Sequence, residues 1–161
     1  MDVFDAIKER RSIRRYKGEP IEKDDIEKMV EAARRAPSAK NLQPWKFVIV
    51  QHPGVLEELV PICQGQKFVG ESGAFIVGMV DDSKWSAVDL TIAMDHLSLE
   101  AVELGYGTCW IGSFDKEGLK QKLELPEGFD PLVCMTVGVP DVKPQPPTKK
   151  SVEELVDWVR V

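Results

Sequence analysis

The sequence is poor in the residues that build metal sites and disulfide frameworks. Its 161 residues include two histidines and three cysteines, which show no metal-ligand spacing. Cys63, Cys109 and Cys134 are odd in number, lie far apart and form no CxxC pair. This pattern indicates core residues in a reducing compartment. We therefore expect neither a metal site nor a disulfide.

Long apolar runs and an excess of basic charge are also missing. No run approaches the roughly 20 apolar residues that span a bilayer, and the first residues form a short amphipathic pattern instead of an apolar signal region. The chain carries 27 acidic and 21 basic side chains, a net charge of −6, whereas a nucleic-acid-binding domain would be strongly basic. We expect a cytoplasmic protein that binds neither nucleic acid nor membrane, with residues 1–161 forming one domain.

Against this acidic background, residues 10–16 (RRSIRRY) contain four arginines and a serine. An apolar pattern at residues 3–7 predicts a short helix that ends just before them. On an extended segment, Arg10, Ser12 and Arg14 would point to one side, and paired guanidinium donors suit the oxygens of a phosphate. A solvated face, a targeting patch or a nucleic-acid contact would use the same residue types.

A polar loop with two prolines, residues 36–45 (APSAKNLQPW), follows a predicted helix. It could be an ordinary connector between a helix and a strand that satisfies its own backbone. It could also form a hydrogen-bonding wall for a flat heteroaromatic ring, with Ser38, Asn41 and Gln43 as candidate donors and acceptors. The residues alone leave both interpretations open.

The remaining pattern predicts a mixed α and β protein with three or four apolar strands and about six helices. We expect helices at residues 23–35, 55–60, 89–104, 115–123 and 152–159, strands at 46–50, 74–80 and 132–137, and a loop with some helix at 63–73. Pro61 is expected to end its helix. The helix at 89–104 is apolar nearly all round, so it should be buried on more than one side, in the core, in a dimer interface or in both. His96 within it is interpreted as a structural or interface residue.

Two further segments have unusual composition. The glycines of residues 105–112 (GYGTCWIG) follow a helix and precede a strand, the reverse of a dinucleotide-binding turn. They would instead let the backbone pass close to something flat, around residues 110–113. Lys149 and Lys150 precede the last predicted helix, where cations oppose the helix dipole. An anionic partner would explain them, and so would a solvated tail.

Taken in order, four segments resemble the signatures of the nitroreductase family of flavoproteins. They are the arginine-rich stretch at 10–16, the loop at 36–45, the long helix with its following turn at 89–112, and Gly138-Val139-Pro140. The resemblance implies an α+β nitroreductase-like fold with a central mixed sheet flanked by helices and a long buried central helix. It also implies that FMN binds at the interface of a homodimer.

The resemblance also implies site residues. In the opening motif they are Arg10, Arg11, Ser12 and Arg14. This motif holds the FMN phosphate, the ribityl chain and the carbonyl side of the ring. Those of the loop that reaches the ring from the other subunit are Pro37, Ser38, Ala39 and Asn41, and those beside flavin N5 are Ile111, Gly112 and Ser113. A basic residue before the last helix, here Lys149 or Lys150 where the family usually has arginine, would complete the phosphate site.

The implied activity is an FMN-dependent oxidoreductase. It would move a hydride from NAD(P)H to flavin N5 and then reduce a nitroaromatic, a quinone or a similar small acceptor in a ping-pong cycle, with no catalytic side chain. The chain is short for the family, without the inserted helical segment that often covers the ring. Alternatives are dehalogenation, substrate oxidation or flavin breakdown at the same site, a non-catalytic FMN sensor, and an RNA-associated protein, which the acidic balance opposes.

Overall fold

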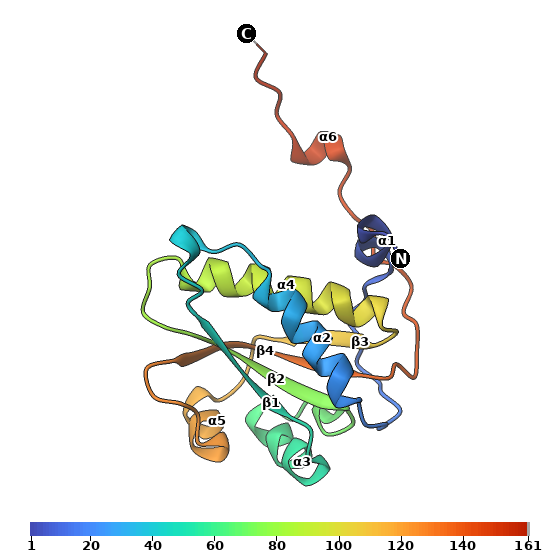
Figure 1. The fold of residues 1–161 in the computed structure, drawn as a ribbon. Helices are drawn as coiled ribbons and strands as arrows, with labels where there is room; N and C mark the ends of the chain where they lie inside the picture. The colour runs from blue at the N-terminus through green and yellow to red at the C-terminus, as the bar shows by residue number, and fades with distance from the viewer. Residues whose placement is uncertain (161) are drawn as a thin grey trace.

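A four-stranded sheet forms the middle layer of the fold (Figure 1). The computed structural model describes residues 1–160. The strands are β1 (Trp45–Val50), β2 (Ala74–Val80), β3 (Gly107–Ile111) and β4 (Asp130–Gly138). They are arranged β1-β2-β4-β3, and each neighbouring pair is antiparallel. The resemblance implied a mixed sheet. The parallel pairing is found outside the four strands, as an isolated bridge between Ser12 and Thr108.

Helices cover both faces of this sheet (Figure 1). One face carries α2 (Lys23–Arg34) and α4 (Ser86–Glu103), and the other carries α3 (Pro53–Ile62) and α5 (Lys116–Leu123). Short 3-10 helices occupy Ala39–Asn41 and Lys67–Val69. The helix α1 (Val3–Glu9) lies beside the C-terminal end of α4, and α6 (Val152–Leu155) lies in a tail that extends away from the sheet. None of the helices in residues 1–160 is both long and apolar enough to cross a membrane.

Each face of the sheet has its own apolar cluster because strand side chains alternate between the two faces. Ile76 and Met135 pack with the α2 and α4 side chains, among them Leu97. Val77 and Cys134 pack on the other face with the α3 and α5 side chains. The pairing of β2 with β4 shifts register between Gly78 and Met79. The shift lies beside Pro131 of β4, and proline, which lacks an N–H donor, is tolerated in a strand at such irregularities.

The predicted elements are present, most of them with ends one or two residues from the predicted ones, and three differences are informative. α4 begins at Ser86, three residues before the predicted start. α3 does not end at Pro61 but continues to Ile62. Proline lacks only its own N–H donor, and the amides after it still form helical hydrogen bonds, such as that from Cys63 N to Leu59 O (2.9 Å). The last helix covers only Val152–Leu155 and not residues 152–159. Its capping box supplies a start, but an isolated short helix without packing is marginal.

Several apolar side chains lie on the outside of the chain. The apolar side of α1 points outward, since Val3, Phe4 and Ile7 are 73%, 66% and 51% exposed. Trp85 and Val88, at the start of α4, are about half exposed. Thus α4 is fully buried along one side only, and the apolar residues on its outer side have no cover within the described chain.

Candidate cofactor site

The arginine-rich stretch is an extended segment fixed beside β3. The Ile13 amide donates to the Thr108 carbonyl (2.8 Å), and Tyr16 forms a bridge with Pro140 farther along. Ile13 and Tyr16 are buried, so they anchor the segment between the polar residues. The predicted extended geometry of Arg10, Ser12 and Arg14 is therefore present.

The side chains of Arg10 and Arg14 come near the same point on β3. Burial raises the pKa of the Cys109 thiol, while the nearby charges of Arg14 and Arg10 act in the opposite direction. Cys109 is only 2% exposed, and both guanidinium groups are close enough for their charges to act on its thiol. Positive charge thus gathers over one strand of an otherwise acidic protein.

Arg11 turns in a different direction, towards the C-terminal end of α1. Its Nη1 donates to the carbonyls of Lys8 (2.5 Å) and Arg10 (2.8 Å), a favourable place for a cation at a helix end. Its Nε is buried and has no hydrogen-bond partner among residues 1–160. Arg11 therefore caps α1 and keeps one donor unused.

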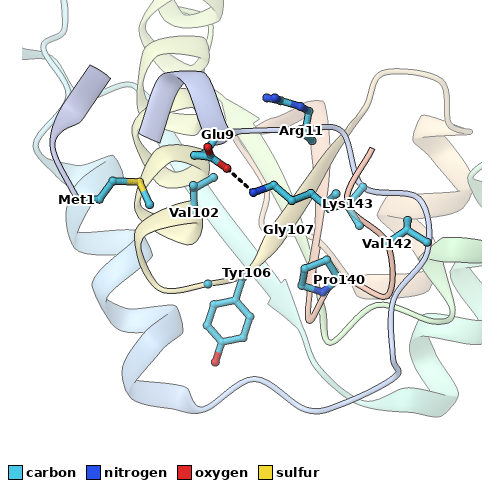
Figure 2. Close-up of a pocket in the computed structure, with 11 residues that line it drawn as sticks. Met1, Glu9, Arg11, Val102, Tyr106, Gly107, Pro140, Val142 and Lys143 are labelled. Carbon is cyan, nitrogen blue, oxygen red and sulfur yellow. Dashed lines mark hydrogen bonds and ion pairs between the residues drawn. The ribbon is translucent and has the colours of Figure 1, made fainter. Parts of the chain in front are cut away.

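A cavity of about 250 Å³ lies between the end of α1, the end of α4 and the start of β3. In Figure 2, Arg11 and the ion pair between Glu9 and Lys143 (2.6 Å) lie on one side of this cavity, and Tyr106 lies on the other. The Lys143 ammonium lowers the pKa of the Glu9 carboxyl. The pair fixes the first residues of the C-terminal tail against α1.

The loop after α2 has an unusual backbone. Lys40, Asn41 and Gln43 all have positive φ angles, between 52° and 57°, a region that residues other than glycine adopt at a cost. Ser38 Oγ accepts from the Gln43 amide (3.0 Å), and Gln43 Nε2 donates to the Asn41 carbonyl (3.2 Å). Ser38 and Gln43 thus serve the loop's own backbone, as the connector interpretation expects, while the Asn41 side chain stays exposed.

Sequence reasoning missed one residue of this region. Asp89, on α4, is 5% exposed, and its Oδ2 accepts from the Ala39 amide (3.1 Å). The sequence did hold a signal for it, because Asp89 is an acidic residue beside Leu90 at the beginning of an apolar helix pattern. A carboxylate buried at such a position requires a hydrogen-bonding or charged partner.

The other predicted residues lie in separate places. Ile111 is buried at the end of β3, whereas Gly112 and Ser113 are exposed, with open space where a Gly112 Cβ would stand. Lys149 and Lys150 are exposed on the tail. Within one chain, the opening motif therefore lies beside β3, whereas the loop after α2 lies at the opposite end of α4 from α1. The two lysines lie on the tail that extends away from the sheet (Figure 1).

Comparison with known proteins decides which family this arrangement represents. Residues 7–77 and 65–139 match the model of the nitroreductase family. The chain belongs to the nitroreductase family. It is 31% identical over 154 residues to an NADH dehydrogenase/NAD(P)H nitroreductase of Methanothermobacter thermautotrophicus, covering 89% of this chain and 80% of that one.

Two further relatives support the same class. An NADPH-dependent oxidoreductase of Staphylococcus saprophyticus is 28% identical, and the match covers 86% of this chain but only 65% of that longer relative. The solved structure of an FMN-dependent nitroreductase from Clostridium difficile superposes with a TM-score of 0.87 at 27% identity, covering 98% of this chain and 99% of that one. The predicted family and α+β fold are confirmed, and the names of the relatives agree with the predicted class, an oxidoreductase that uses FMN and NAD(P)H.

Proposed function

We propose that this chain is an FMN-dependent oxidoreductase that takes hydride from NAD(P)H and passes it to a small acceptor such as a nitroaromatic or a quinone. The observation that carries the proposal is the extended segment anchored to β3, which holds Arg10 and Arg14 near Cys109. Guanidinium groups close together in an acidic chain favour an anion, and a phosphate monoester has the matching geometry. The relatives' names supply the identity of the cofactor.

The residues at the site fit the FMN phosphate by the chemistry of their donors, because Arg10, Ser12 and Arg14 lie on one extended segment beside β3 and offer guanidinium and hydroxyl groups to its oxygens. We assign the phosphate to Arg10 and Ser12 and the carbonyl side of the ring to Arg14, with Arg11 contributing backbone or side-chain contacts. Hydrogen bonds to charged groups contribute about 1.5–3 kcal/mol each. Two or three of them would account for a large part of the roughly 8 kcal/mol that micromolar binding requires.

The remaining site residues reach the cofactor from a second copy of the chain in this proposal. Pro37, Ser38, Ala39 and Asn41 lie too far along α4 to share a site with the arginines of their own chain. The exposed apolar residues of α1 and of the start of α4, Phe4 and Val88 among them, provide a surface for that second copy. The tail supplies a second contact, with Lys149 or Lys150 approaching the phosphate.

When bound, FMN supplies the redox chemistry, and the protein supplies orientation and electrostatics. Arg14 beside the ring would stabilise negative charge on the reduced cofactor. Ile111, Gly112 and Ser113 would lie by the N5 edge, where the open space at Gly112 leaves room for a flat ligand. No acid or base is assigned, so acceptor choice would depend on the shape of the pocket. The short connection between β2 and α4, residues 81–85, would leave that pocket open.

The test is a visible absorption spectrum of the purified protein, repeated under anaerobic conditions after addition of NADH or NADPH. The proposal predicts a flavin spectrum that bleaches with one of the two donors. A flavin spectrum that persists with both would point to a sensor or to another donor, and absence of flavin after incubation with FMN would contradict the assignment. A single domain over residues 1–161 and a cytoplasmic location stay predictions from the sequence.

A further inference from the structure

We propose that Asp89 is the positioning residue for the loop of residues 37–43, holding its backbone in the shape that contacts FMN. This inference rests on the proposed function, because the loop's role at the cofactor belongs to that proposal. It adds a residue that is itself outside the set assigned to the cofactor. Asp89 acts through the Ala39 amide and not by touching the ligand.

The contact between Asp89 and the loop is buried and specific. Asp89 Oδ2 accepts from the Ala39 amide at 3.1 Å, across 50 positions of sequence, and the residue is 95% buried (5% exposed). A buried carboxylate is unfavourable unless hydrogen bonds compensate it. Asp89 lies in the first turns of α4, where the helix dipole also favours negative charge. The Asp89 carboxyl group is thus a buried acceptor aimed at one backbone N–H.

The loop needs an external anchor because its own conformation is strained. Lys40, Asn41 and Gln43 lie in the left-handed region, which is held only where the surroundings over-determine it. The other hydrogen bonds of residues 37–43 join the loop to itself, such as Asn41 N to Ser38 O (3.0 Å) and Leu42 N to Ala39 O (3.1 Å). Among hydrogen bonds within residues 1–160, that from Ala39 to Asp89 is the one that ties this loop to another element.

Side-chain packing gives the loop little alternative support. Cavities of about 530 and 290 Å³ flank it, and Asp89 lines both. Leu42 and Trp85 border the larger cavity, and they are 59% and 51% exposed. A loop that borders open space on two sides keeps its position through its hydrogen bonds. Loss of the Asp89 carboxylate should therefore release Ser38 and Asn41 from their places at the cofactor while the core stays packed.

The experiment compares FMN affinity and thermal stability of the full chain with those of Asp89→Leu and Asp89→Asn. Leucine removes the acceptor at similar volume, and we expect FMN binding weaker by about tenfold or more, because part of the free energy of binding must then order a loop that the Asp89 hydrogen bond no longer holds. Asparagine keeps an acceptor oxygen, and we expect a dissociation constant within about threefold of the unchanged protein, since only the charge is lost. Ile26→Val on α2, a buried methyl deletion, is the stability control and should lower Tm without changing FMN affinity.

Unchanged FMN affinity in Asp89→Leu would overturn the inference, and so would equal losses in Asp89→Leu and Asp89→Asn. Should Asp89→Leu not fold, amide hydrogen exchange of Ala39 in the unchanged apo protein gives the answer. Slow exchange supports the anchor, and exchange at the rate of an exposed loop amide overturns it. An unchanged protein that binds no FMN contradicts the proposed function itself, a result distinct from any variant-specific loss.

Discussion

The two sides of α4 differ in how completely a single chain covers them. On the inner side, Leu90, Met94 and Leu97 are fully buried against the sheet and α2. On the outer side, Trp85 and Val88 are about half exposed, although their side chains are as apolar as those inside. Helical periodicity explains why both sides are apolar. It does not say what covers each side. The inner side stabilises the single chain, and in the proposed dimer the outer side would pack against the second copy.

The largest effect should come from the inner side. Leu97→Ala removes a fully buried side chain and should lower the free energy of unfolding by about 2–5 kcal/mol, because a cavity remains where the structure cannot collapse. Chemical denaturation at a fixed protein concentration measures this change. A loss below about 1 kcal/mol would mean that the inner side of α4 is not the tightly packed part of the core.

Next in size is the effect of Arg10→Ala on cofactor binding. Loss of a charge-assisted contact worth about 1.5–3 kcal/mol should weaken FMN binding by at least about tenfold, so that a folded protein is purified without flavin. Arg34→Ala is the matched control, because Arg34 is an exposed arginine on α2 that pairs with Glu31. Full flavin occupancy in Arg10→Ala, or equal loss in both variants, would refute the phosphate assignment.

The outer side of α4 should respond differently. Val88→Glu places a charge on a side chain that is already 52% exposed, so the isolated chain should keep its fold. In the proposed dimer the charge would become buried, and we expect the dimer dissociation constant to rise by about tenfold or more. Gln121→Glu, on the exposed part of α5, adds the same charge elsewhere and should leave association unchanged. Sedimentation at several concentrations distinguishes the two.

A smaller change is expected within the body of the fold. The Tyr16 hydroxyl and Thr136 Oγ1 lie 2.8 Å apart in a buried hydrogen bond, and burial raises the pKa of Tyr16. Tyr16→Phe should cost about 1 kcal/mol of stability, with dimerisation unchanged. Thr136 Oγ1 can still donate to the Cys109 carbonyl (3.4 Å), which limits the loss. Thermal unfolding checks the size, and a shift in oligomeric state would argue against a purely internal role.

The fold was predictable where local pattern and burial agree. The apolar run at 74–80 became β2 with its predicted bounds, and the helical spacing after residue 89 became α4. The end of the chain was not predictable, because the apolar side chains of Val156, Trp158 and Val159 are exposed and give a helix there no packing to stabilise it.

The site was predictable in part, for a related reason. The alternation of Arg10, Ser12 and Arg14 is a local property, and the structure contains the extended segment it requires. The link from Ala39 to Asp89 depends on how two distant segments meet, which spacing cannot reveal. The distance along α4 between the arginine segment and the Pro37–Asn41 loop is likewise a property of the folded chain. It supports the assignment of the two halves of the site to different copies, which the resemblance implies.

A complementation experiment tests this central claim most directly. Arg10→Ala and Asn41→Ala chains are mixed, allowed to exchange subunits, and titrated with FMN at a concentration that leaves each variant alone unoccupied. If each site combines Arg10 of one copy with Asn41 of the other, every mixed dimer regains one intact site, so about a quarter of all sites should bind after random exchange. If each site is built within one chain, every site carries one defect, and the mixture will bind no more FMN than the separate variants.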